Sequence, residues 1–171
     1  MNLIKPCLIS IVLLLFCGNS FTANRQREAV DVVFCLDLSG STNGLLDDIR
    51  ERIWEVINEV NSYRPSPEFR IGIVGYGRPS FGAKMGYVKV LQDLTTDYDL
   101  LLSELYKLKP AIEKGDQMVG EALRVSVRNM NWSENKNALK TIYLVGNGMV
   151  HLGMTNYRDM CDMSVTKGIV I

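Results

Sequence analysis

The chain of 171 residues has little of what marks several common functional classes. A single histidine excludes a metal site built on several histidines. The 19 acidic side chains balance the 19 basic ones, and no Lys/Arg cluster occurs, which argues against a dedicated nucleic-acid-binding protein. None of the four cysteines forms a C-x-x-C pair, so a zinc ribbon or a thioredoxin-like redox centre is not indicated. The chain also lacks internal repeats and low-complexity linkers, and its length fits one domain.

Long apolar runs are absent too, apart from a short one near the start. Lys5 precedes an apolar run from Leu8 to Phe16, and the small residues Gly18 and Ser20 follow it. This order predicts a secretory signal peptide over residues 1–23, and the run is too short to span a bilayer stably. We therefore expect a domain over residues 24–171 without a transmembrane segment. Such a domain would be secreted or would lie in the periplasm or cell envelope.

Strand-like and helix-like segments alternate along the rest of the chain. Continuous β-branched and aromatic runs are typical of strands buried on both faces, and apolar residues three or four apart indicate helices. The patterns predict strands at 31–36, 69–74, 87–91 and 141–145, the opening of a fifth strand at the end of the chain, and helices over 45–63, 98–108 and 118–130. This alternation predicts an α/β fold with a doubly wound, mostly parallel sheet covered by helices on both faces.

Polar side chains follow the first predicted strand, where such sheets place their binding sites. Asp37, Ser39 and Ser41 alternate in a loop that leads into a helix. One carboxylate and two hydroxyls are oxygen ligands, which suit Mg²⁺ or another hard divalent cation better than zinc or copper. The alternative is a polar loop whose serines cap the next helix.

From about Asp31 to Ile171 the chain resembles the von Willebrand factor A domain family. The segment DVVFCLDLSGS resembles the family's first strand and the opening of its metal-ion-dependent adhesion site, and FRIGIVGYG resembles the second strand and its turn. DLTTDYDLLLSELYKLKP, GDQMVGEAL and TIYLVGNG are similar to later family segments in the same order. The resemblance implies a Rossmann-like fold and binding of a protein or matrix ligand through a divalent cation. It also implies that family members continue beyond Ile171, so we expect a domain incomplete at its C-terminus.

Two positions depart from the family's metal site. The family's second metal loop supplies a threonine where this chain has Gln117, and its fourth-strand turn supplies an aspartate where this chain has Asn147. The resemblance therefore implies a weakened site with Asp37, Ser39, Ser41, Gln117 and Asn147 as candidate ligands. Amide oxygens can coordinate Mg²⁺, but the site loses a negative charge. The neighbouring Asp116 is a possible compensation.

Enzymatic functions find less support in the sequence. The chain has no G-x-S-x-G nucleophile elbow, and Ser39 stands where a D-x-D phosphatase has its second acid. A metal-assisted, phosphatase-like hydrolase that uses Asp37 remains the alternative function. His151 follows the fourth strand near the expected site but is typical of a solvated loop residue. Tyr76, Arg78 and Phe81 lie either on the binding rim or in ordinary loop packing.

The remaining cysteines leave one question of pairing. Cys35 lies inside an apolar strand, which favours a buried free thiol, although a bridge to Cys161 is the alternative in an oxidising compartment. Taken together, the sequence predicts an exported, non-enzymatic adhesion module. Its partner would be a protein or an extracellular or envelope ligand.

Overall fold

A computed structural model describes residues 28–40, 46–109, 115–147, 150–151 and 153–171. The predicted signal peptide over residues 1–23 and the candidate ligand Ser41 lie outside these ranges. The sheet within them has five strands in the order β3-β2-β1-β4-β5. They are β1 (Ala29–Asp37), β2 (Glu68–Tyr76), β3 (Val88–Thr95), β4 (Leu139–Val145) and β5 (Ile169–Val170).

The pairing confirms the mostly parallel sheet, with one exception at an edge. β1 pairs in parallel with β2 and with β4, and β4 pairs in parallel with β5. β3 pairs with β2 in the antiparallel direction and extends to Thr95, four residues beyond the predicted end of that strand. The reason is the connection, which holds only the short 3₁₀ helices Pro79–Phe81 and Ala83–Met85. A parallel neighbour would need a crossover of a dozen or more residues.

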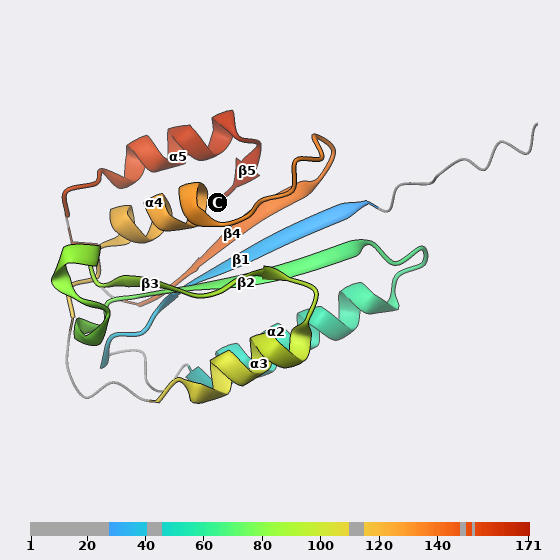
Figure 1. Cartoon of the computed structure of the whole chain (residues 1–171), viewed down its shortest axis with the longest axis horizontal. Coiled ribbons are helices and arrows are strands. Elements are labelled where there is room, and N and C mark those ends of the chain that lie inside the picture. Colours follow the sequence, from blue (N-terminus) through green and yellow to red (C-terminus); the bar gives the residue numbers. More distant parts are fainter. Residues whose placement is uncertain (1–27, 41–45, 110–114, 148–149, 152) are drawn as a thin grey trace, which may run out of the picture.

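Helices cover both faces of this sheet (Figure 1). One face carries α2 (Leu46–Ser62) and α3 (Tyr98–Lys107), and the other carries α4 (Val119–Asn129) and α5 (Tyr157–Thr166). Asp97 caps α3 by accepting a hydrogen bond from the backbone N–H of Leu100 at 2.9 Å. The sequence did not predict α5, because only Met160 and Ser164 of that helix are buried and its apolar spacing is correspondingly weak.

Alternate residues of β1 divide the core into two. Val33 and Cys35 pack with α4 and α5 residues such as Leu123 and Met160, which we call the α4/α5 core. Val32 and Leu36 belong to the second cluster, which contains residues of α2 and α3 and which we call the α2/α3 core. The period of two in a strand explains this division. Asp37 shares the parity of Val33 and Cys35, so its side chain faces the α4 side of the sheet.

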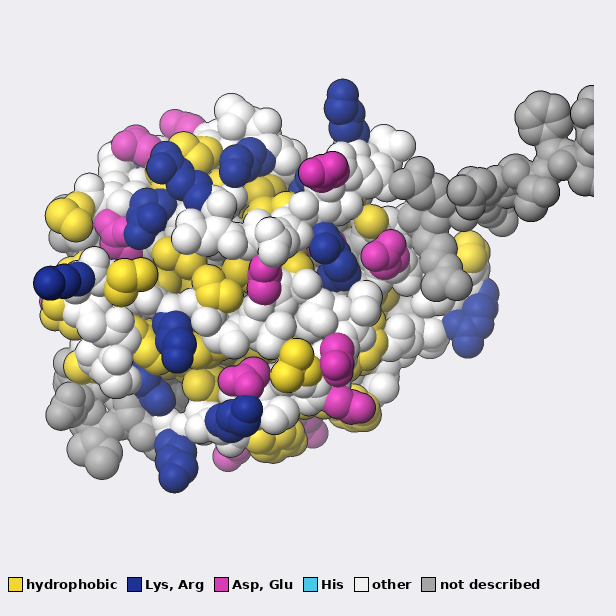
Figure 2. All heavy atoms as spheres, viewed as in Figure 1, with side chains coloured by type: hydrophobic (Ala, Val, Ile, Leu, Met, Phe, Trp, Pro, Cys, Tyr) yellow, Lys and Arg dark blue, Asp and Glu magenta, His cyan; other side chains and the backbone are white. Residues whose placement is uncertain are grey.

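The face in Figure 2 shows no concentration of one charge. Basic and acidic side chains are interspersed over the face in Figure 2, in keeping with the equal numbers of both in the sequence. No helix among the described residues has the length and apolar character needed to cross a membrane. β4 has only Ile142 buried, and it exposes Leu139, Tyr143 and Leu144.

Candidate functional site

Asp37 ends β1 at the edge where the parallel strands present their carboxyl ends. Its side chain is buried, with 2% exposure, and its two oxygens accept different hydrogen bonds. Oδ1 accepts from the backbone N–H of Ser39 at 2.9 Å. Oδ2 accepts from the side-chain amide of Gln117 at 2.8 Å. A carboxylate removed from water needs such donors to offset its lost hydration.

The side-chain amide of Gln117 lies between Asp37, at the end of β1, and Ser39, in the loop that follows. Its Nε2 donates to Asp37 Oδ2 and also to Ser39 Oγ, at 2.8 Å and 3.0 Å. Gln117 immediately precedes Met118, the N-cap of α4, so the start of this helix is tied to the end of β1. The orientation of the amide follows from chemistry, because an ionised carboxylate only accepts and must therefore face the nitrogen end.

Two glycines allow backbone to approach Asp37 closely. Gly77 follows β2 with φ +78°, and a Cβ there would lie 3.0 Å from Asp37 Oδ1. A Cβ on Gly146, which follows β4, would lie 2.6 Å from the Tyr76 hydroxyl and 3.0 Å from Asp37 Cβ. The ends of β1, β2 and β4 therefore converge on one carboxylate. Neither glycine can take a larger side chain without moving this arrangement.

Sequence reasoning did not find the roles of His151 and Tyr76. His151 is exposed, and its Nδ1 accepts from the backbone N–H of Gln117 at 3.0 Å, while its own backbone N–H donates to the Gln117 carbonyl at 3.1 Å. Its sequence position carries no signal of this pairing. Tyr76 is the register partner of Asp37, and a strand alignment could have found it. Burial raises the pKa of the Tyr76 hydroxyl, with smaller contributions from Cys35 and Asp37.

The other two predicted rim residues, Arg78 and Phe81, pack within their loop. Phe81 is half-buried against the α2/α3 core, and half-buried Arg78 donates to the backbone carbonyls of Leu38 and Lys109. Both side chains therefore serve loop packing. Asp116 and Asn147 are exposed at the same edge of the sheet, beside Gln117 and Gly146 respectively. The exposed polar rim of the site thus consists of Asp116, Asn147 and His151, which we call the polar rim.

As the Gln117 amide is oriented, the position between Asp37 Oδ2 and Ser39 Oγ does not fit a divalent cation. A hard cation needs oxygen ligands, and the group shared by Asp37 Oδ2 and Ser39 Oγ is an amide nitrogen with its hydrogens directed at them. Within the described part of the chain, no group of three or more His, Cys, Asp and Glu side chains is placed to hold a metal ion. The predicted ligands Asp37, Ser39 and Gln117 do come together, through hydrogen bonds among themselves.

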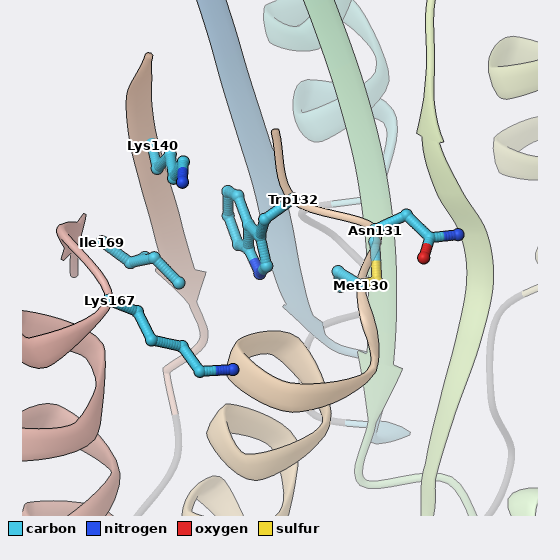
Figure 3. Close-up of a pocket in the computed structure, with 6 residues that line it drawn as sticks. All are labelled: Met130, Asn131, Trp132, Lys140, Lys167 and Ile169. Carbon is cyan, nitrogen blue, oxygen red and sulfur yellow. The ribbon is translucent and has the colours of Figure 1, made fainter. Parts of the chain in front are cut away.

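A separate hollow of about 330 Å³ lies at the opposite end of α4 (Figure 3). Its lining residues are Met130, Asn131, Trp132, Lys140, Lys167 and Ile169. Trp132 Nε1 donates to the Ser126 carbonyl at 2.9 Å, and Lys167 Nζ donates to the Val127 carbonyl at 3.1 Å. These groups satisfy carbonyls of the last turn of α4, which explains them as helix-capping contacts.

Comparison with known proteins finds a matching family model and similar solved structures. Residues 31–168 match the family model described as von Willebrand factor type A domain. Among solved structures, the chain is similar to proximal thread matrix protein 1 from the mussel byssus, with 15% identity and a TM-score of 0.65, covering 85% of this chain and 35% of that one. A second structure of that mussel protein, described as having a zinc-occupied MIDAS motif, matches with the same identity and coverage and a TM-score of 0.63.

A bacterial structure gives a similar result. The vWF domain of the type V pili tip protein Mfa5 from Porphyromonas gingivalis matches with 21% identity and a TM-score of 0.53, covering 72% of this chain and 39% of that one. At these identities the likeness shows the fold alone, and the chain spans only about a third of the mussel protein's length. No curated protein matches the chain.

Proposed function

Because this chain belongs to the von Willebrand factor type A domain family, we propose that it is an exported module that binds a protein or surface ligand through the carboxyl-end edge of its sheet. Domains of this family are generally adhesion and interaction modules rather than enzymes. The observation that carries the proposal is the convergence of three strand ends and the start of α4 on buried Asp37, with the polar rim outside it.

The polar rim is the contact surface in this proposal. Asp116, Asn147 and His151 are exposed side chains with hydrogen-bonding groups, set on a base that the Asp37–Gln117 contact holds in place. A rigid base reduces the ordering cost that a partner must offset on binding. Export is part of the proposal as well. Its support is the apolar run near the start of the chain and the likeness to a byssus matrix protein and a pilus tip protein.

A separate part of the proposal concerns the binding of a divalent cation at this site. Asp37, Ser39, Ser41 and Asn147 are the side chains that would offer oxygens to Mg²⁺ or another divalent cation, and a cation would add positive charge at the rim. Gln117 would contribute through its amide oxygen, whereas its nitrogen faces Asp37. We therefore propose that cation binding at this site is weak, and that partner binding does not depend on it.

Immobilised protein tested against a panel of extracellular-matrix and cell-envelope proteins would examine the proposal. We expect a partner that binds the wild type, loses at least tenfold in affinity with Asp116→Ala/His151→Ala, and binds Lys140→Ala normally. Lys140 lines the hollow at the opposite end of α4 and serves as the matched control. Binding that is lost with Lys140→Ala and kept with the rim variant would place the contact surface elsewhere. Absence of binding across the panel would contradict the proposal for those ligand classes.

A further inference from the structure

We propose that the Gln117 side-chain amide replaces the cation of this site, so that the edge of the sheet is held together without metal. This inference deepens the proposed function, because it concerns the base on which the polar rim stands. It starts from the position of one nitrogen, Gln117 Nε2, which lies 2.8 Å from Asp37 Oδ2 and 3.0 Å from Ser39 Oγ. An ion bridging these two oxygens would have to share their space with that nitrogen.

The electrostatic need of the site is already met by neutral donors. Asp37 is buried, and an isolated buried carboxylate is strongly disfavoured unless charge or hydrogen bonds compensate it. The backbone N–H of Ser39 and the amide of Gln117 supply that compensation to one oxygen each. The two N–H groups of a single amide thereby perform the linking that a cation would perform between the same oxygens.

Hydrogen bonds also hold the backbone of Gln117 in place, so the fold itself fixes the position of the side-chain amide. The backbone of Gln117 pairs with His151 in both directions, through the His151 Nδ1 and through the Gln117 carbonyl. The side chain of Gln117 is buried, with 8% exposure. A cation would therefore have to turn the amide over inside a closed site before an oxygen of Gln117 could face it, and the two hydrogen bonds from Nε2 would be lost.

The structure thus assigns to Gln117 the role of deciding whether this site binds a divalent cation. Exchange for the isosteric glutamate keeps the shape and places a second carboxylate against Asp37, which creates repulsion that a divalent cation relieves. Exchange for threonine shortens the side chain and removes both N–H donors. Both variants should make the protein respond to a cation to which the wild type is indifferent. Gln92→Glu, the same chemical change on β3, is the matched control.

The test is thermal melting of purified wild type, Gln117→Glu, Gln117→Thr and Gln92→Glu, in EDTA and in millimolar Mg²⁺ or Mn²⁺. We expect the wild type and Gln92→Glu each to melt at the same temperature in either buffer. Both Gln117 variants should melt on the order of 5 °C lower in EDTA, since they lose hydrogen bonds to a buried carboxylate. Added cation should raise the melting temperature of Gln117→Glu most.

Two results would overturn the inference. One is a wild type stabilised by the cation as much as Gln117→Glu. The other is a Gln117→Thr variant that melts like the wild type in EDTA. If Gln117→Glu does not fold without a cation, Gln117→Thr carries the comparison alone. No partner enters these measurements, so failure here is distinct from failure to find a ligand for the polar rim.

Discussion

Asp37 is a carboxylate held almost out of water, so at the scale of single residues its hydrogen bonds are costly to lose. Asp37→Ala removes the printed acceptor of the Ser39 backbone N–H and one acceptor of the Gln117 amide. We expect it to lower the free energy of unfolding by about 2–4 kcal/mol, because buried unsatisfied donors cost about 1–3 kcal/mol each. Urea denaturation measures this loss. Asp116→Ala, an exposed neighbour of Gln117, should change stability by less than about 0.5 kcal/mol. Equal losses for the two variants would contradict the arrangement.

The thiol of Cys35 makes stability depend on alkaline pH. It is fully buried in the α4/α5 core, and burial raises its pKa from the ordinary 9.0 to about 12. Below pH 9.0 both folded and unfolded chains keep this proton, so the thiol contributes no pH dependence. Between those two values only the unfolded chain releases it, and the free energy of unfolding falls by about 1.4 kcal/mol per pH unit.

Urea denaturation near pH 8 and near pH 10.5 tests this dependence. The unfolding free energy of the wild type should fall by about 2 kcal/mol more between the two pH values than that of Cys35→Ala. The raised pKa of Tyr76 acts in the same direction in both proteins, so its contribution cancels in the comparison.

In the native protein, half-buried Cys161 should react with a thiol reagent while Cys35 stays protected; both are free thiols. Rapid labelling of native Cys35 would argue against its burial.

Much of the site could be predicted at this scale, and the rest could not for physical reasons. Asp37 and Ser39 follow from their position after a buried strand, and Gln117 and Asn147 from alignment with the family's metal loops. Which end of the Gln117 amide faces Asp37 depends on the spatial approach of α4 to β1, which no local pattern carries. The same applies to His151, whose ring meets Gln117 although the two residues are 34 positions apart in the sequence.

At the scale of elements, the pairing of β1 with β2 includes an ion pair between half-buried Arg70 and fully buried Asp31. Asp31 and Arg70 are register partners, and the guanidinium binds the carboxylate in two places, at 2.8 Å and 2.7 Å. Asp31 is fully buried and also accepts from the backbone N–H of Ser133 at 2.7 Å, which ties the segment after α4 to the sheet. The hydrogen bond to Asp31 raises the pKa of Arg70, so the guanidinium stays charged.

Removing one partner of this pair should be strongly destabilising. We expect Arg70→Ala to cost about 3 kcal/mol of unfolding free energy, because it leaves a buried carboxylate without its charge partner. The exposed pair Arg52–Glu55 on α2 is the control, and Arg52→Ala should cost less than about 0.5 kcal/mol. Chemical denaturation of both variants makes the comparison. A loss below 1 kcal/mol for Arg70→Ala would indicate that solvent reaches Asp31.

The elements themselves were largely predictable, because their burial follows simple periods. The apolar positions of α2 pack into the α2/α3 core at helical spacing, and β1 and β2 are buried on both faces as their continuous apolar runs predict. The direction of β3 and the existence of α5 were not predictable in this way. The first depends on the length of a connection, and the second is a half-exposed helix with few buried side chains.

At the scale of the whole molecule, one part of the sheet exposes apolar side chains. Leu139, Tyr143 and Val170 lie on the face opposite Ile142 and Ile169, and each is more than half exposed, at 55%, 53% and 59%. Thr141 and Val170 are register partners, so these residues share one face of β4 and β5. An exposed apolar patch next to an edge strand favours association between copies of the chain.

Sedimentation velocity over a range of concentrations tests this expectation. The protein over residues 24–171 should associate as its concentration rises, and Tyr143→Lys/Val170→Lys should reduce that association by placing charge on the face. Met154→Lys, at a residue 95% exposed elsewhere on the surface, should leave it unchanged. A wild type that stays monomeric at every concentration would show that this face does not drive association.

In our proposal the Gln117 amide holds the edge of the sheet where a cation would otherwise sit. A crystal structure of the wild type soaked in Mn²⁺, with anomalous diffraction recorded, tests it most directly. We expect Gln117 Nε2 within hydrogen-bond distance of Asp37 Oδ2 and Ser39 Oγ, and no anomalous peak between those oxygens. An anomalous peak there, with the Gln117 amide turned away from Asp37, would contradict it.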